Sequence, residues 1–125
     1  SAVTGRKLGV DGLNRIGERV FNLQRAIMVR QGWGGRDGDR LLDYCHEEPI
    51  QYLRFNRECR VPGKNGKVTS RKGAVVDRTA FEMMKTEYYE RRGWDVQSGF
   101  PGKAKLMELD LKDVAEDLEK SELST

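Results

Sequence analysis

The chain has 125 residues, and its 23 lysines and arginines against 20 acidic residues give a formal net charge of +3. This length predicts one domain, residues 1–125, and the near-balanced charge is not that of a typical nucleic-acid binder. Hydrophobic residues make up 37% of the chain, and no apolar run approaches the roughly 18 residues of a membrane span. We therefore expect a globular domain with neither a membrane-spanning segment nor a signal peptide.

The clearest predicted element is a helix from about Gly9 to Gln31. Its apolar positions alternate in spacings of three and four, as on one face of an α-helix, and they are Leu13, Ile16, Val20, Leu23 and Ile27. Polar and charged residues, among them Arg19, Asn22 and Arg25, occupy the other faces. Gly32 follows as the predicted C′ terminator.

The middle of the chain shows no sustained helical period. Residues 32–39 are rich in glycine and predict a loop around Trp33, and Leu41, Leu42 and Tyr44 suggest a short helical turn. Residues 62–66 predict the turn of a small hairpin. The sequence thus predicts an irregular middle segment.

Helices return in the last part of the chain. Asp77 is a predicted N-cap, and Gly93 is the predicted end of that helix, whose stripe is Phe81, Met84 and Tyr88. A last helical region carries Leu106, Leu109, Leu111, Val114 and Leu118 and ends in a frayed tail, residues 121–125. The predicted fold class is mostly α, a compact multi-helix domain with an irregular middle segment that can form a small hairpin.

Motif searches yield no catalytic, cofactor-binding or metal-binding residue. The glycine loop lacks the Lys-Ser/Thr ending of a P-loop. Asp37, Asp39 and Glu48 fail as a calcium loop because leucine stands where the loop needs glycine.

The two cysteines and the one histidine also predict neither a metal site nor a nucleophilic pair. Cys45, His46 and Cys59 could hold a metal only with a ligand from outside the chain. A Cys45–His46 nucleophilic pair lacks an orienting third group. We expect two buried or half-buried free thiols instead.

Charge is unevenly distributed. Acidic residues gather between Glu108 and Glu122, and basic residues gather in the segment 54–72, where they are Arg54, Arg57, Arg60, Lys64, Lys67, Arg71 and Lys72 against Glu58. With Tyr52 and Phe55 nearby, the segment could bind phosphates and stack on bases. The alternative function is therefore a stand-alone helical binding module that uses residues 54–72 for nucleic acid or an acidic partner. A solvated segment or a docking surface fits the overall charge better.

Three stretches carry a resemblance through their order and spacing, namely GERVFNLQR at 17–25, EYYERRGWD at 87–95 and KLMELDLKDV at 105–114. Residues 39–42 and Glu48-Pro49 lie between the first two, and Gly99 and Pro101 follow the second. Together they resemble the carboxy-terminal domain of the aldehyde ferredoxin oxidoreductase family, over about residues 3–118.

The resemblance implies a parent enzyme that holds tungsten or molybdenum on two pterin dithiolenes beside a [4Fe-4S] cluster. It implies oxidation of aldehydes to carboxylic acids in the cytoplasm, with ferredoxin as electron acceptor, although relatives act on other substrates such as aromatic acyl thioesters. The cluster cysteines of the family lie upstream of the matched domain. We therefore expect no cofactor and no catalytic residue in this chain, whose role would be structural.

The start at Ser1, without a methionine, then favours a piece of a longer protein, with a separately encoded subunit of a split enzyme as the alternative. We expect the remaining domains of the parent as partners, and self-association through apolar surface that those domains would cover.

The matched residues have two interpretations. Gly17, Arg19, Asn22 and Arg25 could line a substrate channel, but we favour ion pairs or carbonyl contacts for the arginines and close helix packing at the glycine. Tyr88, Tyr89 and Trp94 are interpreted as core or domain-interface anchors rather than substrate contacts.

Overall fold

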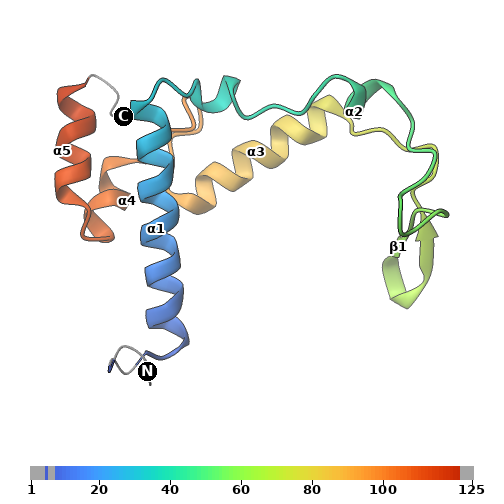
Figure 1. Cartoon of the computed structure of the whole chain (residues 1–125), viewed down its shortest axis with the longest axis horizontal. Helices are drawn as coiled ribbons and strands as arrows, with labels where there is room; N and C mark the ends of the chain where they lie inside the picture. The colour runs from blue at the N-terminus through green and yellow to red at the C-terminus, as the bar shows by residue number, and fades with distance from the viewer. Residues whose placement is uncertain (1–4, 6–7, 122–125) are drawn as a thin grey trace. The chain divides into compact units, whose positions relative to one another are not determined.

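The computed structural model describes Gly5 and residues 8–121, and these are mostly α-helical (Figure 1). The mostly α fold with a small hairpin in its middle is confirmed. None of the described helices is long and apolar enough to cross a membrane. The elements in chain order are α1 (Val10–Arg30), η1 (Gly35–Asp37), α2 (Tyr44–Glu47), β1 (Arg60–Pro62), η2 (Lys64–Gly66), β2 (Val68–Ser70), α3 (Arg78–Arg92), α4 (Lys103–Glu108) and α5 (Lys112–Lys120).

The chain divides into two compact units. Unit 1 comprises residues 1–39 and 86–125, and unit 2 comprises residues 40–85. Helix α3 begins in unit 2 and ends in unit 1. A single domain over residues 1–125 stays a prediction.

The core of unit 1 lies between α1, α4 and α5, which are neighbours in Figure 1. Its buried residues are Ala26, Val29, Leu106, Leu109, Leu111, Ala115 and Leu118. The last helical region is broken into α4 and α5, because Asp110 adopts a left-handed conformation with φ of 56°. Asp is one of the few residues that enter this region readily, so the leucine pattern continues on two short helices instead of one.

The predicted helix ends are confirmed by their hydrogen bonds. After α1, Gly32 has φ of +88° and donates to the Val29 carbonyl, while Trp33 donates to the Met28 carbonyl, as in a Schellman motif. At the start of α3, the backbone N–H of Ala80 donates to Asp77 Oδ1 at 2.7 Å, which makes Asp77 the N-cap.

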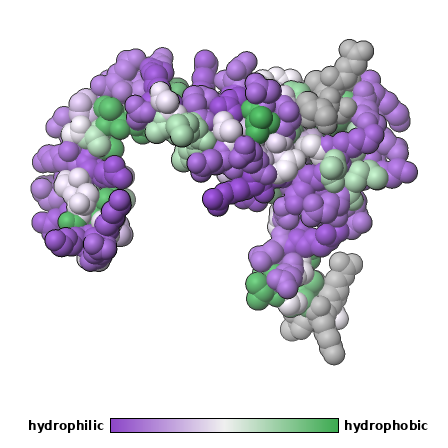
Figure 2. Space-filling view, turned by 180° about the vertical axis from the view of Figure 1, so that it is seen from behind, coloured by the Kyte–Doolittle hydropathy of each residue, from purple (hydrophilic) through white to green (hydrophobic). Residues whose placement is uncertain are grey.

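The orientation of α1 differs from what its sequence pattern suggests. An amphipathic helix ordinarily buries its apolar face, but Leu13, Val20 and Ile27 are 63%, 50% and 46% exposed. The buried residues of α1 are Asn22, Arg25, Ala26 and Val29, on the opposite side. Figure 1 shows the amino-terminal half of α1 extending beyond α4 and α5, and Figure 2 shows hydrophobic surface near that end.

Helix α3 is also rotated away from its predicted face. Met84 and Tyr88 are exposed, whereas Lys85 and Tyr89, each one position further along, are buried. Phe81 is half-buried. The stripe named from the sequence is therefore out of phase with the face that packs.

Unit 2 carries the hairpin. Strands β1 and β2 pair antiparallel, with Arg60 opposite Ser70 and Pro62 opposite Val68, and the predicted turn joins them. The predicted helical turn is α2, which starts at Tyr44 and not at Leu41. In unit 1, the predicted frayed tail lies outside the described residues apart from Ser121, which caps α5.

Candidate functional site

The most connected polar group in unit 1 is the ion pair between Arg25 and Asp39. Arg25 is 6% exposed, and its guanidinium donates hydrogen bonds to both carboxylate oxygens of Asp39, with Nη1 2.9 Å from Oδ1. Its Nε donates to the Gly99 carbonyl at 3.0 Å. One side chain of α1 thus joins the loop after η1 to the loop before α4, as expected from an arginine that makes ion pairs and carbonyl contacts.

Two further side chains donate to the Asp39 carboxylate. The Tyr89 hydroxyl donates to Oδ2 at 2.6 Å, and Trp33 Nε1 lies 3.3 Å from Oδ1. Burial raises the pKa of Asp39, but hydrogen bonds from Arg25 and Tyr89 outweigh it, so that this pKa lies below its ordinary value. Burial and the same hydrogen bond raise the pKa of Tyr89.

The indole of Trp94 closes the other side of Arg25. The guanidinium carbon lies 4.8 Å from the centre of the ring, a cation–π contact. Trp94 Nε1 donates to Asn22 Oδ1 at 2.8 Å, and the Asn22 amide donates to the Glu18 carbonyl at 2.9 Å. Asn22 is 0% exposed, and these two hydrogen bonds explain how a polar residue can lie on the buried face of α1.

Two glycines let the loops of this network approach each other. Gly35 has φ of +55°, and a Cβ there would lie 2.0 Å from the Ser98 carbonyl oxygen. Gly99 has φ of +69°, and a Cβ there would lie 3.0 Å from Arg25 Nη2. Asp95 stabilises the turn that precedes Gly99 by accepting hydrogen bonds from the Ser98 backbone N–H and hydroxyl at 2.6 and 2.7 Å. These hydrogen bonds lower the pKa of Asp95.

The chemistry of this network favours positioning over catalysis. A general base needs a pKa near the working pH and a free lone pair aimed at substrate. Asp39 has a lowered pKa, and its oxygens accept from Arg25, Tyr89 and Trp33. No buried side-chain nitrogen or oxygen of the described residues lacks a hydrogen-bond partner. The network can therefore tie unit 1 together, but it offers no base to a substrate.

The aromatic side chains of residues 87–95 belong to the same cluster. Tyr89 and Trp94 are buried and their rings stack at 5.9 Å, while Tyr88 meets Trp94 edge-on at 5.8 Å. The interpretation of Tyr89 and Trp94 as core anchors is confirmed. Tyr88 is 37% exposed and belongs to the surface of this cluster.

Of the four α1 residues interpreted from the sequence, Asn22 and Arg25 belong to the network, whereas Gly17 and Arg19 do not. Arg19 is exposed and makes no ion pair with a described residue. A Cβ on Gly17 would meet nothing within 4 Å, so no close helix packing within the described chain requires this glycine.

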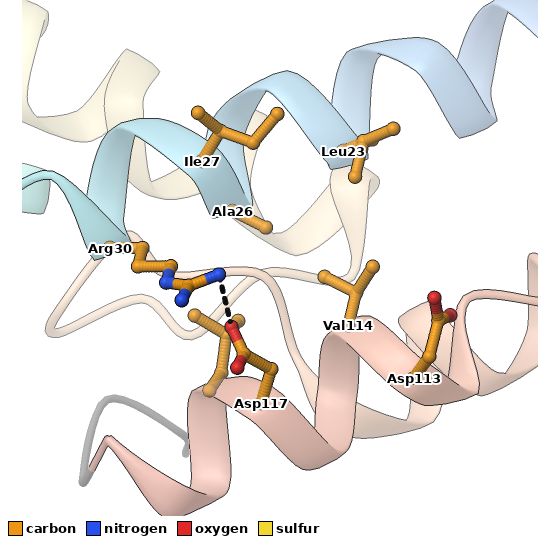
Figure 3. A pocket seen from close by; sticks show the side chains of 8 residues that line it. Leu23, Ala26, Ile27, Arg30, Asp113, Val114 and Asp117 are labelled. Atoms are coloured by element: carbon orange, nitrogen blue, oxygen red, sulfur yellow. Dashed lines mark ion pairs between the residues drawn. The ribbon is translucent and has the colours of Figure 1, made fainter.

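A groove lies between α1 and α5 (Figure 3). It has a volume of about 290 Å³, and Figure 3 shows Ala26 and Val114 on its facing walls. An ion pair between Arg30 and Asp117, at 2.9 Å, spans it. The groove holds no cluster of chemical groups beyond that pair and Asp113.

In unit 2, the cysteines and the histidine form no site. Cys59 is buried, Cys45 is half-buried and both are free, which confirms the predicted thiols. His46 Nδ1 lies 2.7 Å from the Val76 carbonyl oxygen, and its ring meets Phe81 edge-on at 6.0 Å. Among the described residues, no three His, Cys, Asp or Glu side chains gather as a metal site would require.

The basic segment of unit 2 surrounds the hairpin. Phe55 is 93% exposed and Tyr52 is 71% exposed, and Arg54 lies 5.4 Å from the Phe55 ring centre. The seven basic side chains of residues 54–72 make no ion pair with the described residues. The segment is thus exposed, which both interpretations of it expect.

Sequence reasoning named Arg25, Tyr89 and Trp94 but missed Asp39 as the centre of the network. Asp39 stands 14 residues from Arg25 and 50 from Tyr89, and no local pattern links these three positions. The only signal is that an acid, Asp39, ends a glycine-rich loop, where a carboxylate that becomes buried would need a cation.

Comparison with protein families gives one finding. The family model described as aldehyde ferredoxin oxidoreductase, domains 2 & 3, matches residues 1–111. The match includes α1, α3, α4 and all the residues of the Arg25–Asp39 network. A search of solved structures found no match.

Proposed function

Since this chain belongs to the aldehyde ferredoxin oxidoreductase family, we propose that it is the carboxy-terminal domain of an enzyme that oxidises aldehydes to carboxylic acids. In that reaction an aldehyde and water give a carboxylic acid, two electrons and two protons. Ferredoxin in the cytoplasm is the proposed acceptor of the electrons. The observation that carries the proposal is the family match over residues 1–111.

The proposed role of the chain itself is structural. Its best-formed polar network holds Asp39 between Arg25 and Tyr89, so the carboxylate is committed to internal hydrogen bonds. Such a network fixes the loops at 33–39 and 95–100 against α1 and gives the parent a rigid domain beside its active site. Substrate binding and turnover are assigned to the rest of the parent.

The cofactors implied by the family do not fit the donors of this chain. A [4Fe-4S] cluster takes four cysteine thiolates, whereas the chain has two cysteines. Cys59 is buried and Cys45 is half-buried, and the described residues gather no third ligand. The tungsten or molybdenum pterin and the cluster are therefore proposed to bind residues outside this chain.

The test is the longer polypeptide that the proposal requires. An open reading frame that continues upstream of Ser1, with a cysteine motif, is the first expected result. The complete polypeptide should then contain tungsten or molybdenum and iron, and should reduce ferredoxin or a low-potential dye when an aldehyde is added. The 125-residue chain should do neither. A start codon directly before Ser1, together with no metal in the chain or in any protein that copurifies with it, would contradict the proposal.

The alternative, a binding module that uses residues 54–72, is not favoured by the family match. The observations in its favour are the exposed Phe55 and the basic side chains, which have no ion-pair partner among the described residues. Binding of DNA or RNA that weakens as salt rises, and that disappears when Arg57, Arg60 and Lys64 are neutralised, would support it.

A further inference from the structure

A cavity lies in unit 2 between residues 40–46, which lead into α2, and the first turns of α3. Figure 1 shows α2 beside the start of α3. The cavity has a volume of about 320 Å³, and half-buried Leu41 and Phe81 give it an apolar wall. The other lining residues carry polar or charged groups, and they are Arg40, Asp43, His46, Arg78 and Glu82. An apolar wall beside a few polar groups, at this volume, is typical of a site for a small molecule.

Contacts within unit 2 hold the polar groups around this cavity in place. Arg78 Nη2 lies 3.0 Å from Asp43 Oδ1 and 3.1 Å from Glu47 Oε1, so that two carboxylates fix the guanidinium. His46 Nδ1 lies 2.7 Å from the Val76 carbonyl oxygen, which fixes the imidazole ring. The site is therefore formed before a ligand arrives, and this lowers the cost of ordering side chains on binding.

One charged group of the lining remains available to a ligand. Asp43 pairs with Arg78, and Glu82 pairs with Lys85 at 2.8 Å, so both acids of the lining already have a cation. The Arg40 side chain is exposed and makes neither an ion pair nor a hydrogen bond with a described residue. The cavity therefore offers a ligand one uncommitted positive charge, which favours an anion.

The His46 ring also keeps one nitrogen available. A carbonyl oxygen only accepts hydrogen bonds, so Nδ1 carries the proton that faces Val76, and Nε2 makes no hydrogen bond with a described residue. No buried side-chain nitrogen of the described residues lacks a partner, so the unbonded Nε2 reaches solvent. His46 forms no site with the two cysteines, but it lines the same cavity as Arg40 and offers a second polar contact there.

We propose that this cavity binds a small carboxylate ion with an apolar body. The planar guanidinium of Arg40 matches the two oxygens of a carboxylate, and Leu41 and Phe81 contact the hydrocarbon part of the ligand. A phosphate dianion fits less well, because the Asp43 and Glu82 carboxylates repel its second negative charge. The ligand class is therefore a monoanionic organic acid.

Carboxylic acids are also the product class of the reaction proposed above. The carboxylate site nevertheless rests on the cavity of unit 2 and not on the proposed function, because binding is measured on the 125-residue chain without any turnover. Metal content and aldehyde oxidation of the complete polypeptide test the function and leave the binding results unchanged. Either proposal can therefore fail while the other stands.

The single histidine of the chain reports on the cavity directly, because the ring proton NMR signals can come from His46 alone. Titration with benzoate, at constant pH and ionic strength, should shift these signals along a saturation curve with a dissociation constant of the order of 1 mM. Benzamide, which is neutral, acetate, which lacks the apolar ring, and inorganic phosphate should each bind at least about tenfold more weakly. No saturable shift with benzoate, or an equal affinity for any of the other three, would overturn the proposal.

Two matched arginine substitutions test the contact with the carboxylate. Arg57 is the control, because it is an exposed arginine of unit 2 that does not line the cavity and has no ion-pair partner among the described residues. Arg40→Gln should weaken benzoate binding about tenfold or more, whereas Arg57→Gln, which removes the same charge, should leave it unchanged. Arg40→Lys keeps the charge but loses the planar fork, so its affinity should lie between those of the wild type and Arg40→Gln. An equal loss in Arg40→Gln and Arg57→Gln would overturn the proposal, and if Arg40→Gln does not fold, an unchanged affinity in Arg40→Lys would overturn it.

Discussion

Replacing Arg25 by methionine removes the guanidinium at the centre of the unit 1 network while keeping a side chain of similar length. Arg25 is 6% exposed and bonds to both Asp39 oxygens and to the Gly99 carbonyl. The substitution leaves the Gly99 carbonyl without this donor and the partly buried Asp39 carboxylate without its cation, although Tyr89 and Trp33 still donate to the carboxylate. It also removes the cation from the face of Trp94.

The size of the effect follows from burial. Breaking a fully buried ion pair by removing one partner costs about 3–5 kcal/mol. The Asp39 side chain keeps 26% of its surface exposed, so water replaces part of the lost interaction, and we expect Arg25→Met to cost about 2–4 kcal/mol of unfolding free energy. Arg15→Met is the matched control, because Arg15 pairs with Asp110 on side chains that are 47% and 72% exposed. An exposed pair of that kind contributes about 1 kcal/mol or less.

Urea unfolding of the two variants, followed by far-ultraviolet circular dichroism, measures both free energies. Tryptophan fluorescence gives a second probe, because Trp33 and Trp94 both contact the network. The double variant Arg25→Met with Asp39→Asn should be less destabilised than the sum of the single variants, because removing both charges leaves neither unpaired. If Arg25→Met costs no more unfolding free energy than Arg15→Met, the network does not stabilise unit 1.

Three further predictions follow from the same structure. Asp39 has a folded-state pKa below its ordinary value of 3.8, so its contribution to stability is present above that value and is lost as the pH falls through the lower folded value. The Asp39→Asn variant should therefore lose less unfolding free energy than the wild type between pH 5 and pH 2, roughly the acid range over which a salt-bridged aspartate titrates. An equal loss in the two proteins would contradict this prediction. Gly35→Ala should destabilise the chain more than Gly66→Ala in urea unfolding, because both glycines have positive φ, at a cost of about 1–2 kcal/mol, but only the Cβ on Gly35 meets the Ser98 carbonyl, at 2.0 Å. Elemental analysis of the purified 125-residue chain should find no stoichiometric tungsten, molybdenum or iron, and one equivalent of any of them would contradict the assignment of the cofactors to the rest of the parent.

Local patterns were sufficient for the ends and types of most elements. Glycine at position 32 and aspartate at position 77 mark helix ends because their caps are made by neighbours within a few residues. The hairpin turn at residues 62–66 is local for the same reason. The break at Asp110 was missed, because a single left-handed residue between two leucine-rich helices leaves the apolar pattern almost intact.

Patterns could not reveal which face of α1 or α3 is buried. Periodicity reports that Leu13, Val20 and Ile27 share a face, but it does not report what that face meets. In this chain the buried face of α1 is the one that carries Asn22 and Arg25, whose hydrogen bonds run to Trp94 and Asp39. Polar residues can occupy a buried face when every donor finds an acceptor, and that condition depends on loops 14 to 74 residues away.

The sequence by itself determined the helical class, the helix ends, the scarcity of metal ligands and the family, since these depend on composition, on short-range hydrogen bonds or on stretches of residues in a fixed order. Only the tertiary structure decided that Asp39 joins Arg25 and Tyr89, and that the apolar row of α1 remains exposed. The physical reason is the range of the interactions. Caps and turns are closed by near neighbours along the chain, whereas an ion pair or a packed face needs residues that the chain brings together only when it folds.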